Sequence, residues 1–145
     1  MREPLAAIPN PNRVFVDTSA YFALYNAGDF FHLNAVTVIE TARRRLFTTN
    51  FIVAESHALL LRRLGRAVAA LFLDEIYRSG TVIIRISDAD ERRARVIIAT
   101  HDDKDYSLTD ATSFAVMERL RIGTAFTFDR HFGQYGFALL GPDEP

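Results

Sequence analysis

The chain alternates short apolar runs with longer segments in which apolar residues recur at helical spacing, and this alternation restricts the fold more than any other feature. The short runs are rich in Val, Ile, Phe and Thr and predict strands at 13–16, 46–49, 81–86 and 124–128, with a short edge strand at 137–140. Helical segments between strands act as crossovers, which make the strands parallel. We therefore expect an α/β fold with a mostly parallel sheet of four or five strands, covered by helices on both faces.

Helix boundaries follow from residues that cap or break helices. Asn50 can cap a long helix that ends at Gly65, and Ser79 with Gly80 stops the next one. The triplet Arg43 to Arg45 suits the negative end of a helix dipole, so the second helix is expected to end there. The predicted helices cover 19–26, 32–45, 50–64, 66–79, 88–100 and 110–120.

Length and composition predict one globular domain. The chain has 145 residues, of which 49% are hydrophobic, and a single domain at 13–141 can bury one sizeable core. Pro4, Pro9 and Pro11 break regular structure near the amino end, so residues 1–12 are expected to form a flexible arm.

Charge and cysteine content exclude several functions. The net charge of −1 gives no overall positive field, so a polyanion would have to be bound by a local patch. Lys104 is the only lysine among 17 basic residues; arginine suits bidentate contacts to phosphate, although a genomic bias toward arginine explains the count equally well. The absence of cysteine excludes disulfides, thiol catalysis and Cys-ligated metals. Neither a signal peptide nor a membrane-spanning run is predicted, so a cytoplasmic location is expected.

Two carboxylates follow predicted central strands directly. Asp17 ends the run of residues 14–16, and Asp129 ends the run of residues 126–128. Ligands of open α/β sheets bind at the carboxyl edge of the strands. Both acids are therefore expected at a binding edge.

Two further acids have apolar neighbours at helical spacing. Glu55 is flanked by Ile52 and Leu59, which predicts that its side chain lies on the core-facing stripe of a helix. Asp110 precedes Phe114 by one turn, which predicts an inward direction for it as well. The sequence therefore predicts that four acids at the ends of different elements converge on one cleft.

Four close carboxylates cannot all stay ionised unless their pKa values rise or a cation neutralises them. An all-oxygen site of this kind suits a hard cation such as Mg²⁺, or Mn²⁺ in its place. Carboxylate-bound metals activate water and stabilise the charge that develops on a phosphate during phosphodiester hydrolysis. The pattern therefore predicts a metal-dependent nuclease.

Most of these acids also have an ordinary structural explanation when they are taken singly. Asp17 and Asp110 suit a helix N-cap or first turn, and Asp129 suits a turn. Glu55 is the exception, because an acid in the middle of a helix stripe caps nothing. The joint pattern favours a site more strongly than any one residue does.

Other polar residues give weaker signals. His57 and His131 have no second histidine at metal-ligand spacing, so each is expected to be packed or on the surface, without a catalytic role. Asp103 or Asp105 could reach a second metal, although solvated charge is usual in such a polar loop. Arginines near one helix end could bind the phosphates of a substrate, although charged helix faces are usually just solvated: Arg62, Arg63 and Arg66.

The segments "VFVDTSAYFALYN", "TTNFIVAESHALL", "DKDYSLTDATSFAVM" and "AFTFDRHFGQYGF" resemble, as an ordered set, the PIN domains of VapC-type toxins. The resemblance spans about residues 13 to 140, and the four acids fall on the acidic positions of the family. It implies a three-layer α/β/α fold, cleavage of RNA, a homodimer, and inhibition by a cognate antitoxin. Asp17 and Asp110 would be the principal Mg²⁺ ligands, Glu55 and Asp129 would complete the pocket, and three hydroxyl side chains would support it: Thr18, Ser19 and Ser113.

Three other functions fit parts of the pattern. A phosphatase of the haloacid-dehalogenase type could use Asp17 as its nucleophile, but it needs a second aspartate where Ser19 stands. A non-catalytic module that binds nucleic acid or protein would not be expected to keep all four acids. A structure-specific DNA or RNA nuclease with a housekeeping role differs from a toxin only in its substrate, and the sequence does not separate the two.

Overall fold

The structure, a computed structural model, describes residues 12–41 and 44–141, so the predicted N-terminal arm lies outside the described residues apart from Asn12. Five strands form one sheet in the order β3-β2-β1-β4-β5, and every neighbouring pair is parallel. The strands are β1 (Arg13–Val16), β2 (Arg45–Thr49), β3 (Val82–Ile84), β4 (Thr124–Phe126) and β5 (Ala138–Leu140).

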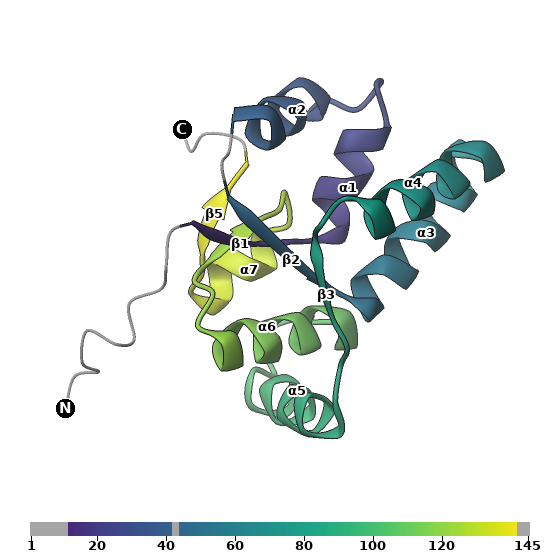
Figure 1. The fold of residues 1–145 in the computed structure, drawn as a ribbon. Coiled ribbons are helices and arrows are strands. Elements are labelled where there is room, and N and C mark those ends of the chain that lie inside the picture. Colours follow the sequence, from purple (N-terminus) through teal and green to yellow (C-terminus); the bar gives the residue numbers. More distant parts are fainter. Residues whose placement is uncertain (1–11, 42–43, 142–145) are drawn as a thin grey trace.

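Helices cover both faces of the sheet, which gives the predicted three-layer α/β/α architecture. The first group is α1 (Thr18–Tyr25), α2 (His32–Thr41), α3 (Asn50–Leu64) and α4 (Arg66–Arg78), and the second is α5 (Asp88–Thr100), α6 (Leu108–Leu120) and α7 (Arg130–Tyr135). The two groups lie on opposite sides of the strands (Figure 1). This division follows from right-handed crossovers, because the chain builds outward from β1 to β3 and then returns to β4 and β5.

The return of the chain creates a switch point between β1 and β4. These two strands are neighbours, yet the connections that leave their carboxyl ends run to opposite sides of the sheet. Such a crevice is the usual ligand site of an open α/β sheet. Asp17 follows β1 directly, and Asp129 follows β4 after two residues.

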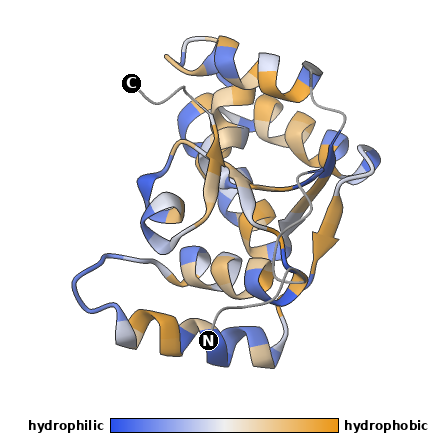
Figure 2. Cartoon of the chain, turned by 90° about the vertical axis from the view of Figure 1, so that its left-hand side faces the viewer, coloured by the Kyte–Doolittle hydropathy of each residue, from blue (hydrophilic) through white to orange (hydrophobic). Residues whose placement is uncertain are grey.

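Large aromatic side chains fill the space between the layers. Phe15 on β1 and Phe132 on α7 are fully buried, with ring centroids 6.2 Å apart, and Phe114 on α6 packs edge-on against Phe132. Hydrophobic residues dominate the strands, while hydrophilic residues gather in the connecting segments (Figure 2). No helix in the described ranges is long and apolar enough to span a membrane.

The expected helix at 32–45 was wrong at its end. Helix α2 is described as far as Thr41, Arg43 lies outside the described residues, and Arg45 opens strand β2 instead, paired with Arg13. Both guanidinium groups lie over the ring of Phe47, at 4.6 Å for Arg13 and 5.8 Å for Arg45. This cation–π contact favours the extended strand over a helix terminus.

Other boundaries differ by a few residues. Thr49, and not Asn50, caps α3, because its hydroxyl accepts a hydrogen bond from the backbone N–H of Ile52 at 3.1 Å. Strands β3 and β4 are shorter than predicted, and α4 ends at Arg78. The short helix α7 was not predicted.

A salt bridge joins the start of α5 to the end of α6, the helix that carries Asp110. Asp90 is 3% exposed and accepts two hydrogen bonds from the guanidinium of Arg119, both at 2.9 Å. It also completes a capping box with Ser87. Burial alone would raise the pKa of Asp90, but the Arg119 and Ser87 hydrogen bonds lower it below its ordinary value.

We expect Arg119→Ala to lower the free energy of unfolding by about 3 kcal/mol, because it leaves the buried carboxylate of Asp90 without its partner. The matched control is Arg93→Ala, which breaks the more exposed Arg93–Glu118 pair and should cost less than about 1 kcal/mol. Urea denaturation at pH 7 measures both. Equal losses in the two variants would contradict this ranking.

Candidate active site

An open cleft of about 300 Å³ lies at the switch point. All four acids singled out in the sequence line it, together with Thr18 and Ser19. The remaining lining residues are Leu59, Asp105, Ser107 and His131.

Asp17 is the most buried acid of the cleft. It is 4% exposed, and its Oδ2 accepts hydrogen bonds at 2.9 Å from both the Ser19 hydroxyl and the Thr127 hydroxyl. The pKa of Asp17 is raised to about 6, mainly by burial and to a small extent by the charge of Asp129, although these hydrogen bonds lower it. Asp17 is also the N-cap of α1.

Asp110 is fixed by the amino end of its helix. It is 9% exposed and forms a capping box with Ser107, whose backbone N–H donates to Asp110 Oδ2 at 3.1 Å. The same oxygen lies 2.8 Å from Nδ1 of His131. The carboxylate is therefore held in one orientation from two elements.

Asp129 caps α7, and its Oδ1 accepts a hydrogen bond from the backbone N–H of His131 at 2.9 Å. Its own N–H donates to the Thr127 hydroxyl at 2.9 Å. Because Thr127 also donates to Asp17, one hydroxyl connects the two acids across the switch point. Asp17, Asp110 and Asp129 thus act as first-turn or capping acids and also line the cleft.

Glu55 reaches the cleft from a different face than the sequence predicted. The prediction of a core-facing stripe was wrong, because Glu55 is exposed and the buried side of α3 carries Ile52, Val53, Ser56 and Leu60. Glu55 lies on the adjoining face of the helix and accepts a 2.5 Å hydrogen bond from the hydroxyl of Thr18. The partner of Glu55 is therefore Thr18, another residue that lines the cleft.

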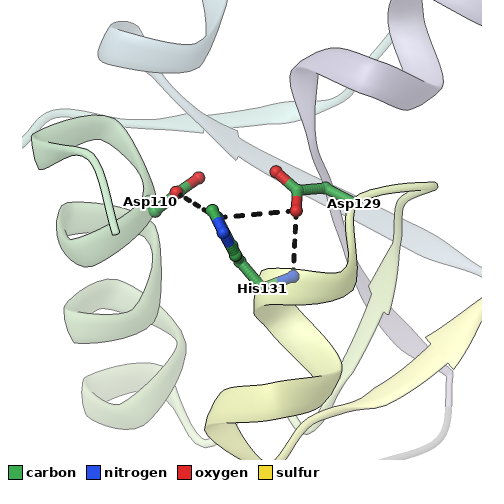
Figure 3. Close-up of side chains that lie close together, drawn as sticks. All are labelled: Asp110, Asp129 and His131. Carbon is green, nitrogen blue, oxygen red and sulfur yellow. Dashed lines mark hydrogen bonds and ion pairs between the residues drawn. The ribbon is translucent and has the colours of Figure 1, made fainter. Parts of the chain in front are cut away.

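His131 lies among the acids, contrary to the packed or surface position expected for it. Figure 3 shows its ring between the carboxylates of Asp110 and Asp129, at 2.8 Å and 3.5 Å. One ligand atom from each of these three residues lies within 4.8 Å of the other two. Tyr106 contacts the His131 ring edge-on and fixes its position.

The hydrogen-bonding residues Thr127, Ser107 and His131 were missed from the sequence. His131 stands two residues after Asp129, the acid at the end of a strand. A helix at 130–135 was not predicted; had it been, its first turn would have placed His131 beside the cleft. Thr127 is a polar residue within an apolar strand-end run, and that was its only signal.

Several predicted residues take other positions. Within the described residues, the Ser113 hydroxyl bonds to the carbonyl of Thr109 at 2.8 Å and does not reach the four acids. Asp105 lines the cleft, whereas Asp103 pairs with Lys104 at 2.9 Å. His57 does not line the cleft. The predicted phosphate-binding arginines lie in the last turn of α3 and the first residue of α4: Arg62, Arg63 and Arg66.

The donor atoms of the cleft suit a divalent cation. They are carboxylate oxygens with one imidazole nitrogen, and hard cations prefer oxygen donors. The raised pKa of Asp17 shows that its negative charge is unfavourable in the metal-free site. A bound cation would remove that penalty.

The family model described as the PIN domain matches residues 14–138. The chain belongs to the PIN-domain family. Among PIN proteins, the 23S rRNA-specific endonuclease VapC20 of Mycobacterium tuberculosis is 38% identical over 134 residues, which are 90% of this chain and 99% of that protein. A VapC ribonuclease of Archaeoglobus fulgidus is 33% identical over 81% of this chain and 77% of its own. The predicted resemblance to VapC-type PIN domains is confirmed.

Two solved structures agree with the fold. The crystal structure of VapC20, described as a sarcin–ricin loop cleaving toxin, has a TM-score of 0.85 at 33% identity and covers 89% of this chain and 99% of its own. FitAcB from Neisseria gonorrhoeae has a TM-score of 0.65 at 15% identity, with coverage of 88% and 96%, and shares the fold.

We expect the metal-free protein to gain stability as the pH falls from 7 to about 5. The pKa of Asp17 is raised from 3.8 to about 6, so the folded state takes up a proton in this range that the unfolded state does not. A shift of about two pKa units lowers the free energy of unfolding by about 3 kcal/mol at neutral pH. This loss of stability disappears as the pH falls through 6 toward 4.

Urea denaturation of metal-stripped wild type and Asp17→Asn across pH 4.5–7.5 measures this effect. Asp17→Asn should be the more stable protein at pH 7 and should lose the pH dependence that belongs to Asp17. Parallel stability curves for the two proteins would refute the assignment.

Proposed function

We propose that this protein is a Mg²⁺-dependent endoribonuclease that hydrolyses RNA phosphodiester bonds in the acidic cleft, and that it is the toxin of a toxin–antitoxin pair. Mn²⁺ is a possible substitute for Mg²⁺. The observation that carries the proposal is the convergence of four carboxylates, one of them buried with a raised pKa, at the switch point of a PIN domain. Relatives named VapC ribonuclease or endonuclease support the activity.

In this proposal, Asp17 and Asp110 are the principal metal ligands, and Glu55 and Asp129 complete the pocket. When bound, the cation would supply activation of water and stabilisation of charge on the phosphate. Asp110 and Asp129 are oriented beforehand by backbone N–H groups, so they need little rearrangement to bind it. His131 is added to the predicted set as a residue that contacts both of these acids.

Hydroxyl side chains keep the other two acids in place. Ser19 and Thr127 donate to Asp17, and Thr18 donates to Glu55. Such supporting hydrogen bonds fix the direction of a ligand and tune its basicity. Ser113 has no comparable contact with an acid among the described residues and is left out of the proposed site.

The first substrate to test is a structured loop of ribosomal RNA. The relative with 38% identity is a 23S rRNA-specific endonuclease, and its crystal structure is described as that of a toxin that cleaves the sarcin–ricin loop. We propose a similar substrate here, an antitoxin as the protein partner, a homodimer, and a cytoplasmic location where ribosomal RNA is available.

Asp110→Asn should lower RNA cleavage by about 100-fold or more while the domain stays folded, because asparagine keeps a capping oxygen but removes the ligand charge. The assay is cleavage of a sarcin–ricin loop hairpin with Mg²⁺, Mn²⁺ or chelator, and chelator should stop the wild-type reaction. Glu91→Gln, an exposed acid of α5, is the control and should cut normally. Wild-type activity in Asp110→Asn would contradict the assignment of Asp110 to the active site.

Thr18→Val should lower activity by about 10- to 100-fold, because Glu55 loses the hydroxyl that orients it. The measurement is cleavage rate against Mg²⁺ concentration, and the variant should need more metal for half-maximal rate. Thr100→Val removes a hydroxyl that bonds to its own helix and to His101 and does not line the cleft, so this variant should behave as wild type. An identical metal dependence in Thr18→Val and wild type would rule out this role for Thr18.

A further inference from the structure

Helices α1 and α3 contact each other at the cleft and again at a second point further along both helices. At the cleft, the Thr18 hydroxyl bonds to Glu55. One turn further along α1, the ring of Phe22 lies beneath the guanidinium of Arg63, which is 5.4 Å from the ring centroid. The two contacts define a seam that begins at the acids and ends at an arginine.

The cleft side of α3 continues along this seam. Glu55, Leu59 and Arg63 are spaced by four residues, so they follow one face of the helix. Glu55 and Leu59 both line the cleft. Arg63 therefore stands on the same face, about 12 Å from Glu55 along the helix axis at 1.5 Å per residue.

The positive charge at the end of the seam has no carboxylate partner. Arg62, Arg63 and Arg66 are exposed, and none of them forms a salt bridge within the described part of the chain, whereas Arg93 and Arg119 are paired. Cations in the last turn of α3 suit its dipole, which accounts for Arg62 and Arg63. The dipole does not account for Arg66, which opens α4, where a cation is unfavourable.

A phosphate backbone that approaches this cleft meets repulsion from the acids themselves. The cations that hold it must therefore stand beside the acids, at a distance from the scissile phosphate. Arg63 meets this requirement, and the Phe22 ring limits the freedom of its side chain, which lowers the entropy lost when it binds a phosphate.

We infer that the α1–α3 seam is the path of the RNA strand leaving the active site, and that Arg63, seated on Phe22, binds a backbone phosphate there. This inference rests on the proposed ribonuclease function. Arg62 and Arg66 extend the positive patch beyond that phosphate. Phosphate contacts position the strand and do not read its sequence.

The test separates strand binding from chemistry. Binding is measured by fluorescence anisotropy with a labelled sarcin–ricin loop hairpin at several KCl concentrations, with every variant combined with Asp110→Asn so that the strand is not cut. Cleavage is measured with Asp110 intact. Arg63→Ala should weaken binding about 5- to 10-fold at 100 mM KCl and reduce the slope of log K against log salt by about 0.7 to 0.9, the loss of one phosphate contact. KM should rise by a similar factor while kcat stays near wild type.

Two further variants sharpen the assignment. Arg63→Lys keeps the charge, so its salt slope should stay near wild type while its affinity falls less than that of Arg63→Ala. Phe22→Leu removes the aromatic seat and should weaken binding in the same direction, with Arg63 still present. The matched control is Arg95→Ala, an exposed arginine of α5 on the opposite side of the sheet, which should bind and cut as wild type.

The outcomes distinguish this inference from the proposed function. If Asp110→Asn abolishes cleavage but Arg63→Ala keeps the wild-type salt slope and KM, the seam is not the RNA path and the nuclease assignment stands. An equal loss in Arg95→Ala and Arg63→Ala would also overturn the inference, because it would indicate a general charge effect. If the wild type neither binds nor cuts the RNA with any metal, the proposed function itself fails.

Discussion

Burial of carboxylate charge at one edge of the sheet is the constraint around which the other contacts of the site are arranged. Asp17 is buried, and its pKa of about 6 records how unfavourable its charge is without a cation. The protein tolerates this cost because each buried acid also receives hydrogen bonds that it would need in any helix of this kind. Asp17 and Asp129 cap α1 and α7, and Asp110 completes a capping box. The helix ends therefore offset part of the cost of burying this charge.

The order of the strands explains why these helix ends meet. Neighbouring strands β1 and β4 direct the following chain to opposite sides of the sheet, so α1 and α7 begin on either side of one crevice. The amino end of α6 reaches the same crevice, and the ion pair between Asp90 and Arg119 ties that helix to α5. The positions of the acids thus follow from topology and packing. The chemistry uses a convergence that the fold already provides.

All four acids of the cleft were predicted from the sequence, whereas the face of α3 that carries Glu55 was predicted wrongly and several hydrogen-bonding residues were not predicted. An acid directly after a β-branched or aromatic run marks the carboxyl edge of a strand, which placed Asp17 and Asp129 correctly. Glu55 was assigned to the wrong face of α3, because Leu59, one of its apolar neighbours, lines the cleft and does not enter the core. His131 was missed because α7 has only six residues, too few to show helical periodicity. Hydrogen bonds such as those of Thr127 join residues far apart in sequence, and local patterns carry no information about them.

The double role of the acids changes how substitutions at this site are to be interpreted. Replacing Asp17 with alanine removes a helix cap together with a negative charge that burial makes unfavourable, and these losses act on stability in opposite directions. An alanine variant of unchanged stability would therefore hide two effects of about 1 kcal/mol or more each. Asparagine separates them, because it keeps an oxygen for the backbone N–H and loses only the charge. Glu55 caps nothing, so at this position alanine and glutamine differ chiefly in the hydrogen bond to Thr18. The contrast between the capping acids and Glu55 distinguishes residues that the fold requires from one that mainly serves the cleft.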